Sequence, residues 1–418
     1  MDWLLLALAF FNAVSMLMVF RQRTFQGSLL KGMLSFAVAQ IATELAWLWL
    51  PLQLVLALLL IASGALESNP GAFAMGVLVF SWIALAINIR QSFKACEEVE
   101  LALQRGLGAD YRHRIPASIA REMRSDVRFS DYARPFHFRR DGVELIKDVP
   151  YGKGGVRRRL DIYRPVMRPE QGCPVLLQIH GGAWIMGDKR HQGLPLMNHL
   201  AERGWICVAI NYRLGPSCSF PVELTDCKDA LGWIRMHGHE YGMNTDFVAV
   251  TGGSAGGHLT ALMGLTQNQK DLQPTYPDAD TSVQACIPFF GVYDFLGRDG
   301  LHPNIEGVIE FLQNNVMHCA PEDNPALWDL ASPLTRVNAS APPFMTIHGT
   351  RDSLAPVAMA RLFSQRLRAA SDNASVYLEL EGAEHSFELL RTPRTEFVCD
   401  GVHRFLEWVR AGGSINAP

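Results

Sequence analysis

The chain has 418 residues, which is more than one ordinary domain needs, and 49% of them are hydrophobic. Its net charge of −3 gives it no overall basic character, so no nucleic acid partner is expected. Eight cysteines are too few for a disulfide scaffold in a chain of this length, and no Cys/His cluster has zinc-site spacing, so no metal or other cofactor is expected. Cys218 and Cys227 could pair in an oxidising compartment, but we expect both to be reduced.

The hydrophobic residues are concentrated at the amino terminus. Residues 3–20 form an apolar run interrupted only by Asn12 and Ser15, and a membrane-spanning helix needs about 20 residues. The run has no basic segment before it and no small-x-small cleavage site. The sequence therefore favours an uncleaved helix over a signal peptide.

Two further spans are predicted downstream of this first one. Residues 45–66 are the densest part of a long apolar stretch, with 35–44 leading into it and a kink expected at Pro51. Two shorter helices are the alternative for this stretch. Residues 72–89 form the next span. We therefore expect residues 1–95 to be a transmembrane region of about three spans, in contact with membrane lipid.

The positions of lysine and arginine predict an orientation in the membrane. Basic residues fall within 21–31 and 90–94, whereas the turn at 67–71 has none, and basic loops favour the cytoplasmic side. Three spans therefore place the rest of the chain in the cytoplasm, and four spans would place it outside. Glu44 lies beside a span, where a functional role is the default, but we expect it to be solvated near the interface.

Residues 96–140 are expected to form a basic juxtamembrane linker. Its arginines are Arg105, Arg112, Arg114, Arg121, Arg124, Arg128, Arg134, Arg139 and Arg140. Such a segment can lie on anionic lipid, at roughly 1 kcal/mol per basic residue near the surface. A solvated, partly helical connector is the alternative that the sequence leaves open.

Residues 141–418 alternate between strand-like and helix-like patterns. The predicted strands are 143–149, 156–163, 175–179, 205–211, 247–250, 283–290, 344–347 and 376–380, and the predicted helices are 193–203, 221–237, 258–267, 355–369 and 395–410. Apolar strands separated by helices indicate an α/β fold, with a mainly parallel sheet covered on both faces. Such sheets bind ligands at the carboxyl ends of their strands, so the loops that follow the strands are the candidate site.

Residues 252–257 read GGSAGG and lie between a predicted strand and a predicted helix. A serine framed as Gly-x-Ser-x-Gly at such a turn is the nucleophile-elbow pattern. The strained turn exposes the serine Oγ, and small neighbours are needed because the chain is crowded there. Ser254 is therefore the candidate nucleophile. Taken alone, the pattern also fits an ordinary glycine-rich turn.

The loop at 180–184 reads HGGAW and follows an apolar strand. A glycine-rich turn at this place lets backbone N–H groups face a developing negative charge. We predict an oxyanion hole formed by the N–H groups of Gly181, Gly182 and Ala255.

The predicted general base is His385, which follows the last strand, and the acid that orients it is Asp352, which follows the strand at 344–347. The chain order Ser, Asp, His is that of α/β hydrolases. The rival acids Glu379, Glu381 and Glu384 lie too near His385 in sequence to come from a separate strand end. His180 and His348 are expected to be structural histidines that bond nearby backbone.

Residues 291–340 fall between strands and contain the apolar side chains Phe295, Leu296, Ile305, Phe311, Leu312 and Trp328. We expect this segment to form a small cap that shapes an acyl pocket. An ordinary packed helix pair is the alternative.

With HGGAW, GGSAGG, HGTRD and EHSF in this order, the chain resembles the carboxylesterases of the hormone-sensitive-lipase-like branch of α/β hydrolases. The resemblance covers about residues 140–410, points to bacterial membrane-anchored carboxylesterases and lipases, and extends more weakly to prenylcysteine methylesterases. It implies the α/β-hydrolase fold with an eight-stranded sheet, no metal, and hydrolysis of carboxylic esters. Many members have a third glycine where this chain has Ala183, whose Cβ would narrow the room around the ester carbonyl.

Residues 141–418 are thus predicted to be a catalytic domain that hydrolyses short- to medium-chain or lipid-like carboxylic esters at a membrane, through an acyl-enzyme. An amidase or peptidase using the same triad is one alternative. A non-catalytic receptor of the same fold is another, and the filled triad positions argue against it.

Overall fold

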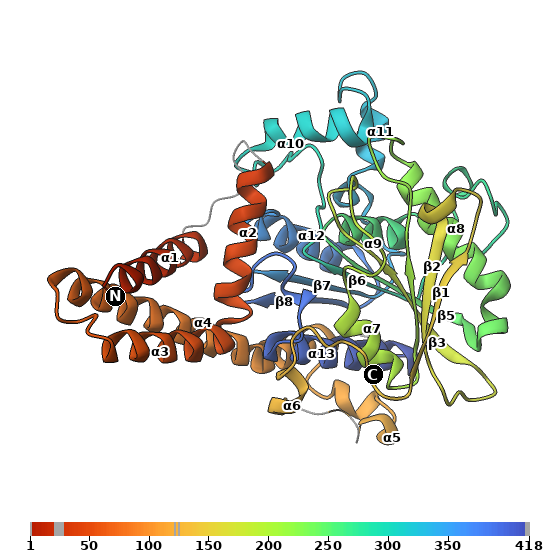
Figure 1. Ribbon diagram of the computed structural model, residues 1–418. Coiled ribbons are helices and arrows are strands. Elements are labelled where there is room, and N and C mark those ends of the chain that lie inside the picture. The colour runs from red at the N-terminus through yellow and green to blue at the C-terminus, as the bar shows by residue number, and fades with distance from the viewer. Residues whose placement is uncertain (1, 21–28, 121–122, 124–125, 414–418) are drawn as a thin grey trace.

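The computed structural model describes residues 2–20, 29–120, 123 and 126–413. An amino-terminal bundle, formed by α1, α2, α3 and the first half of α4, projects from an α/β domain (Figure 1). The helices are α1 Asp2–Phe20, α2 Leu29–Thr43, α3 Ala46–Ala62, α4 Asn69–Leu107, α5 Ala117–Ala120, α6 Phe129–Tyr132, α7 Leu194–Ala201, α8 Val222–His237, α9 Ala255–Leu265, α10 Ile305–Leu312, α11 Pro325–Leu330, α12 Val357–Ala370 and α13 Pro393–Arg410. Short 3-10 turns lie at Tyr111–Arg114, Gly155–Arg158, Gly238–Tyr241, Lys270–Leu272, Pro333–Arg336 and Phe387–Leu389, and a π turn at Gln313–Met317.

Within the described residues, eight strands form one sheet in the order β1-β2-β4-β3-β5-β6-β7-β8. The strands are β1 Val143–Pro150, β2 Arg159–Pro165, β3 Cys173–Ile179, β4 Ile206–Ile210, β5 Met243–Gly253, β6 Ala285–Phe289, β7 Phe344–Gly349 and β8 Ser375–Leu380. β2 pairs antiparallel with β1 and β4, and all other pairs are parallel. The predicted α/β-hydrolase fold is confirmed.

Helices cover both faces of the sheet, and each face has its own hydrophobic core. α8, α9 and α12 pack on one face, and α7, α13 and the second half of α4 pack on the other. Strands β3, β4 and β6 are buried along their whole length, which is why they read as uniformly apolar runs. Because β3, β5, β7 and β8 run parallel, the loops after them meet at one edge of the sheet.

Polar side chains hold the bundle together from inside. Asn12 Oδ1 of α1 accepts hydrogen bonds from Gln53 Nε2 of α3 at 2.6 Å and from Trp49 Nε1 at 3.3 Å. Gln53 Oε1 accepts in turn from Trp82 Nε1 of α4 at 2.9 Å. Such bonds between apolar helices fix which faces meet.

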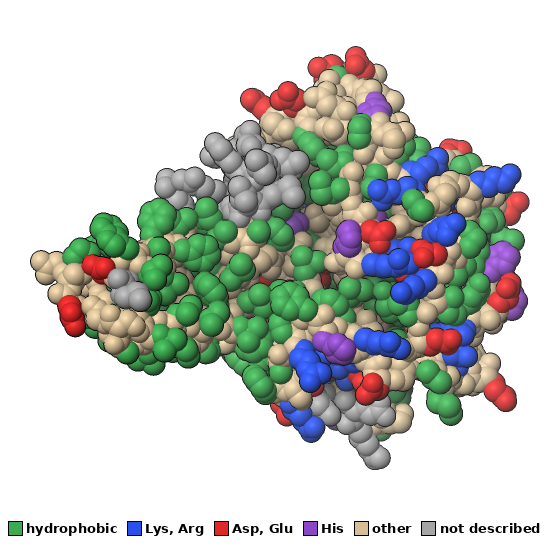
Figure 2. Space-filling model, viewed as in Figure 1, with side chains coloured by type: hydrophobic (Ala, Val, Ile, Leu, Met, Phe, Trp, Pro, Cys, Tyr) green, Lys and Arg blue, Asp and Glu red, His purple; other side chains and the backbone are tan. Residues whose placement is uncertain are grey.

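The outer surface of the bundle is apolar. Trp3, Phe10, Phe73 and Phe80 are among its most exposed side chains, with Phe80 80% exposed. Figure 2 shows hydrophobic side chains covering the bundle, while charged side chains gather on the α/β domain. By length and composition, α1 and α4 could each cross a membrane, and Phe36–Thr43 with Ala46–Ala62 could be a third span if this bent pair counts as one.

The break in the second apolar stretch does not lie at Pro51, where we expected a kink. α3 continues through Pro51, and the helices on either side of Glu44 and Leu45 meet at 82° instead. The prediction that Glu44 is solvated is also wrong, because its side chain is fully buried and pairs with Arg394 of α13. The partner of Glu44 lies 350 residues away in the chain, so no local pattern could show its burial.

Helix α4 does not end at the predicted membrane boundary. It runs without a break into the α/β domain, where Val99, Leu103 and Leu107 are buried against the sheet and α13. Residues 96–107, expected in the linker, are thus part of a core helix. Of the linker arginines, Arg140 is bonded to Glu202 and Glu396, whereas Arg121 and Arg124 lie outside the described residues. All eight cysteines are free thiols, including Cys218 and Cys227.

Candidate active site

Ser254 lies at the tip of the turn between β5 and α9. Its backbone has φ 57° and ψ −120°, a conformation that costs a non-glycine residue about 1–3 kcal/mol. Only glycine fits on both sides of it: a Cβ on Gly252 would lie 2.4 Å from Ile179 O, and one on Gly256 would lie 2.1 Å from the same atom. Close packing of β3 against the turn therefore requires the glycines and holds Ser254 in its strained position.

His385 and Asp352 meet at the ends of β8 and β7. His385 Nδ1 lies 2.8 Å from Asp352 Oδ2, and both side chains are buried. Burial would raise the pKa of Asp352, but the charge of His385 and hydrogen bonds from His348 and His385 outweigh it and hold that pKa well below its usual value. Burial would lower the pKa of His385, but the Asp352 carboxylate outweighs burial and raises it.

Asp352 is held by more than one partner, so its carboxylate cannot rotate. Oδ1 accepts the backbone N–H groups of Leu354 at 2.9 Å and Ala355 at 2.7 Å. Oδ2 also lies 3.1 Å from His348 Nε2, which bonds Ala355 O at 3.0 Å as well. His348 does bond nearby backbone as expected, and it additionally orients Asp352.

The rival acids lie elsewhere. Glu384 is turned to the backbone, where its Oε1 accepts from the N–H groups of His385 at 2.9 Å and Ser353 at 2.7 Å. Burial raises the pKa of Glu384 to about 7. Glu379 pairs with Arg361 and Glu381 with Lys94.

The loop at 180–184 lies beside Ser254, and one of its predicted donors is already occupied. The Gly181 N–H donates to Gln192 Oε1 at 2.6 Å, so this structure does not present it to the pocket. Among the described loop residues no acceptor takes the Gly182 N–H, and Ala255 opens α9, where first-turn N–H groups have no partner within the helix. All three N–H groups stay predicted oxyanion donors, and Gly182 and Ala255 are the two that this structure leaves without a side-chain partner among its described residues.

Ala183, the departure from three glycines, adopts φ 51°, and Trp184 follows with φ 61°. The left-handed region costs roughly 1–2 kcal/mol for a residue with a Cβ. Trp184 is held in place by a bond from its Nε1 to His258 Nδ1 at 3.1 Å, and His258 Nε2 bonds Ala331 O at 2.7 Å. The loop is thus fixed although two of its residues are strained.

Gln192 is a site residue that the sequence did not reveal. Besides Gly181, its buried side chain hydrogen-bonds the Glu388 carboxylate, and a Cβ on Gly253 would lie 2.4 Å from its Nε2. It therefore contacts the loop at 180–184, the serine turn and the segment after His385 at once. Burial raises the pKa of Glu388 to about 7. A lone glutamine carries no pattern from which this could be read.

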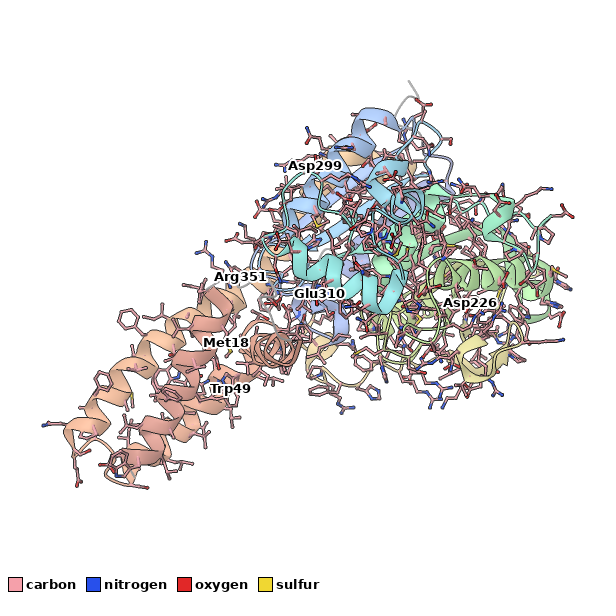
Figure 3. All side chains as sticks on the ribbon, turned by 90° about the horizontal axis from the view of Figure 1, so that it is seen from above. Met18, Trp49, Asp226, Asp299, Glu310 and Arg351 are labelled. Carbon is pink, nitrogen blue, oxygen red and sulfur yellow. The ribbon has the colours of Figure 1, made fainter. Side chains whose placement is uncertain are left out.

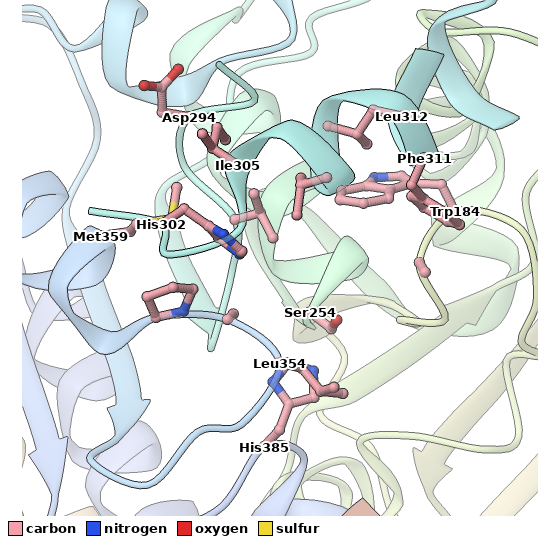
Figure 4. Close-up of a pocket in the computed structure, with 15 residues that line it drawn as sticks. Trp184, Ser254, Asp294, His302, Ile305, Phe311, Leu312, Leu354, Met359 and His385 are labelled. Carbon is pink, nitrogen blue, oxygen red and sulfur yellow. The ribbon is translucent and has the colours of Figure 1, made fainter. Parts of the chain in front are cut away.

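A cavity of about 150 Å³ opens beside Ser254 and His385. Figure 4 shows these two side chains at one end of it and the α10 side chains Ile305 and Leu312 at the other. The remaining lining is Ala183, Trp184, Val292, Asp294, His302, Val308, Phe311, Leu354, Ala355, Pro356 and Met359. Most of these side chains are apolar, so the cavity suits an acyl chain.

The expected cap is present in part. Ile305, Phe311 and Leu312 line the cavity, whereas Phe295 and Trp328 are fully buried in the core behind it. His180 bonds the Gly181 carbonyl through Nδ1 at 2.7 Å and stacks on Tyr212 with ring centroids 4.4 Å apart, which is the structural role expected for it. Within the described residues, no group of histidine, cysteine, aspartate and glutamate side chains could hold a metal ion.

The fold and the strand-end loops define an α/β hydrolase, and known proteins narrow the class. The family model described as BD-FAE matches residues 160–367. Esterase B from Lactobacillus rhamnosis shares the fold, with a TM-score of 0.54 and 20% identity over 76% of this chain and 96% of that one.

Relatives from Mycobacterium tuberculosis include LipQ and LipM. Esterase LipQ is 44% identical over 62% of this chain and 61% of its own length, so the match leaves more than a third of LipQ uncovered. LipM, named as a probable carboxylic ester hydrolase, is 42% identical over 80% of this chain and 78% of its own length. The chain belongs to the family of carboxylic ester hydrolases that includes LipM, which confirms that its motifs are those of a carboxylesterase.

Proposed function

We propose that the protein is a serine carboxylesterase that works through an acyl-enzyme on Ser254. The observation that carries the proposal is the contact of 2.8 Å between His385 Nδ1 and Asp352 Oδ2, beside a strained serine that shares one apolar cavity with the imidazole. The relatives LipQ and LipC are named esterases, and LipM is named a probable carboxylic ester hydrolase. These names support the same reaction.

In the proposed mechanism, His385 Nε2 takes the proton of Ser254 as Oγ attacks the ester carbonyl carbon. Asp352 keeps the other imidazole proton on Nδ1 and stabilises the imidazolium. The Gly182 and Ala255 N–H groups receive the oxyanion, and loss of one such donor typically costs about 10²–10³ in rate. His385 then protonates the leaving alkoxide. A water molecule, activated by the same imidazole, releases the acid and restores Ser254.

The apolar cavity favours esters of short- to medium-chain or lipid-like acids. Bundle helices with exposed aromatic side chains suit a hydrocarbon environment, so we place the enzyme at a membrane with residues 1–95 as its multi-pass region. We also place residues 141–418 on the cytoplasmic side, since exposed Arg90 follows the apolar half of α4. A carboxy-terminal tag should then be digested by protease only in inside-out vesicles.

The test of the reaction uses the full-length protein in detergent. Ser254→Ala should abolish hydrolysis of p-nitrophenyl butyrate and labelling by a fluorophosphonate, which reacts with activated serines. Ser340→Ala, at an exposed serine, is the matched control and should behave as the unaltered protein. Turnover that survives Ser254→Ala would refute the assignment. A matched panel of esters and amides separates the esterase from an amidase or peptidase.

A further inference from the structure

The amino-terminal bundle touches the catalytic histidine itself. Gln40 of α2 donates from Nε2 to the backbone carbonyl of His385 at 2.5 Å, and the Phe36 ring meets the His385 imidazole edge-on, with centroids 6.4 Å apart. Figure 1 shows α2 upright between the rest of the bundle and the α/β domain. A helix that only anchors the domain would have no need to reach this residue.

The end of α2 also fixes the segment that leads to His385. Glu44 pairs with Arg394 of α13, and both side chains are buried. Arg394 Nη2 in turn donates to the carbonyl of Glu381, at the start of the histidine loop, at 3.2 Å. One chain of contacts thus runs from α2 through α13 to the loop.

Helix α4 holds the loop that carries the catalytic acid. Asn88 Oδ1 accepts from Arg351, the neighbour of Asp352, at 2.8 Å, while Asn88 Nδ2 donates to Ala42 O of α2 at 2.8 Å. Figure 3 shows Arg351 where the bundle joins the α/β domain. The two loops that supply the acid and the base therefore both rest on the bundle.

The Gln40 contact has the features of a positioning contact. Gln40 is 8% exposed, and its Oε1 has no hydrogen-bond partner among the described residues. A buried oxygen without a partner is costly, so an apolar side chain would serve better if packing were the whole role. The loop that Gln40 contacts is also strained, because Ser386, directly after His385, has φ 55°. A strained backbone persists only where surrounding contacts fix it.

We propose that Gln40 is a positioning residue for His385 and that the docked bundle is a structural part of the active site. This inference rests on the proposed function. Gln40 fixes the His385 backbone, and this alignment keeps Nδ1 on Asp352 and Nε2 toward Ser254. An imidazole shifted by about 1 Å can cost about 100-fold in rate. Disturbing the contact should therefore lower kcat while leaving substrate binding in the cavity intact.

The test compares two variants of the full-length protein in detergent. Gln40→Met removes the donor and keeps the length of the side chain, and Gln53→Met makes the same change where the amide bonds only Asn12 and Trp82 inside the bundle. Steady-state kinetics with p-nitrophenyl butyrate, followed across pH, are the readout.

For Gln40→Met we expect kcat to fall about tenfold or more with KM little changed. The acid limb of its kcat/KM profile should move to lower pH, because a looser contact with Asp352 raises the His385 pKa less. Gln53→Met should keep both kcat and the profile. Phe36→Leu removes only the ring contact and should also lower kcat. It replaces Gln40→Met as the test if Gln40→Met folds poorly.

Unaltered kcat in both Gln40→Met and Phe36→Leu would overturn the inference, as would equal losses in Gln40→Met and Gln53→Met. Neither result affects the proposed reaction, which fails only if Ser254→Ala still hydrolyses the ester.

Discussion

Replacement of the proposed catalytic acid by its amide, Asp352→Asn, tests the geometry of the site most directly. Oδ1 is fixed as an acceptor by the N–H groups of Leu354 and Ala355. An asparagine must therefore place its oxygen there and its NH2 group at the Oδ2 position, facing His385 Nδ1 at 2.8 Å. The imidazole can then only present a lone pair on Nδ1, which puts its proton on Nε2.

A proton on Nε2 prevents His385 from accepting the proton of Ser254. We expect kcat/KM to fall about 10⁴-fold, as for the wrong tautomer in other serine hydrolases, which is about 5.5 kcal/mol of transition-state stabilisation. The Asp352 charge raises the His385 pKa, so its removal should lower that pKa. The residual activity of the variant should therefore decline at a lower pH, on the acid side of its profile, than the activity of the unaltered enzyme does.

Ester hydrolysis from pH 5 to 9 measures both effects, with Glu384→Gln as the matched control. Glu384 is a buried carboxylate directly before His385 in the loop after β8, but it accepts hydrogen bonds from backbone N–H groups rather than from the imidazole. Its amide should cost less than about tenfold, the worth of one ordinary hydrogen bond. If Asp352→Asn keeps nearly full activity while Glu384→Gln loses it, the acid has been assigned to the wrong residue.

Four further changes probe the surroundings of the triad. Gln192→Ala removes the support of the oxyanion loop, and kcat for p-nitrophenyl butyrate should fall about tenfold or more; an unchanged kcat would contradict its role. Ala183→Gly relieves a left-handed alanine and widens the cavity, so kcat/KM should rise for branched acyl esters relative to butyrate, and a parallel change for both would speak against a steric limit. Burial raises the Glu388 pKa to about 7 from 4.5, so its contribution to stability is present below pH 4.5 and lost as pH rises through 7. Glu388→Gln should abolish that loss and be more stable at pH 8 by up to about 3 kcal/mol in denaturant unfolding, and an undiminished pH dependence would exclude Glu388 as its source. Glu44→Gln leaves the Arg394 charge buried and should cost about 3–5 kcal/mol in thermal unfolding, whereas Glu44→Leu with Arg394→Met should recover most of it; equal instability of both would point to packing instead.

Much of the fold could be predicted because its cause is local. Buried parallel strands appear as continuous apolar runs, and β3, β4 and β6 were found where such runs lie. The predicted strand at 156–163 begins only at Arg159, because Gly155–Arg158 forms a 3-10 turn with no strong signal of its own. The helix after Ser254 begins at Ala255 rather than at 258, since small residues there hide the helical pattern.

The candidate site divides in the same way. Ser254, Asp352 and His385 could be proposed because each follows a strand, and parallel strands bring such loops to one edge. Gln192 and Gln40 could not, since a lone glutamine belongs to no motif: Gln192 accepts the Gly181 N–H from 11 residues away, and Gln40 donates to the carbonyl of His385, 345 residues away. The bond that occupies the Gly181 N–H likewise depends on a side chain outside the HGGAW motif.

The bundle and the site are related rigidly, and this follows from α4. A bundle that only anchored the domain would need no more than a flexible connection to it. Instead α4, 39 residues long in all, runs unbroken from its apolar half into the core of the α/β domain. At about 1.5 Å per residue it is roughly 58 Å long, about twice the hydrocarbon thickness of a bilayer. The match to LipM spans 80% of this chain, which is more than residues 141–418 contain, so it extends into the part of the chain that holds α4. In the membrane location that we propose, an unbroken α4, which accepts a hydrogen bond from the neighbour of Asp352 through Asn88, would hold the cavity at a fixed height above the bilayer.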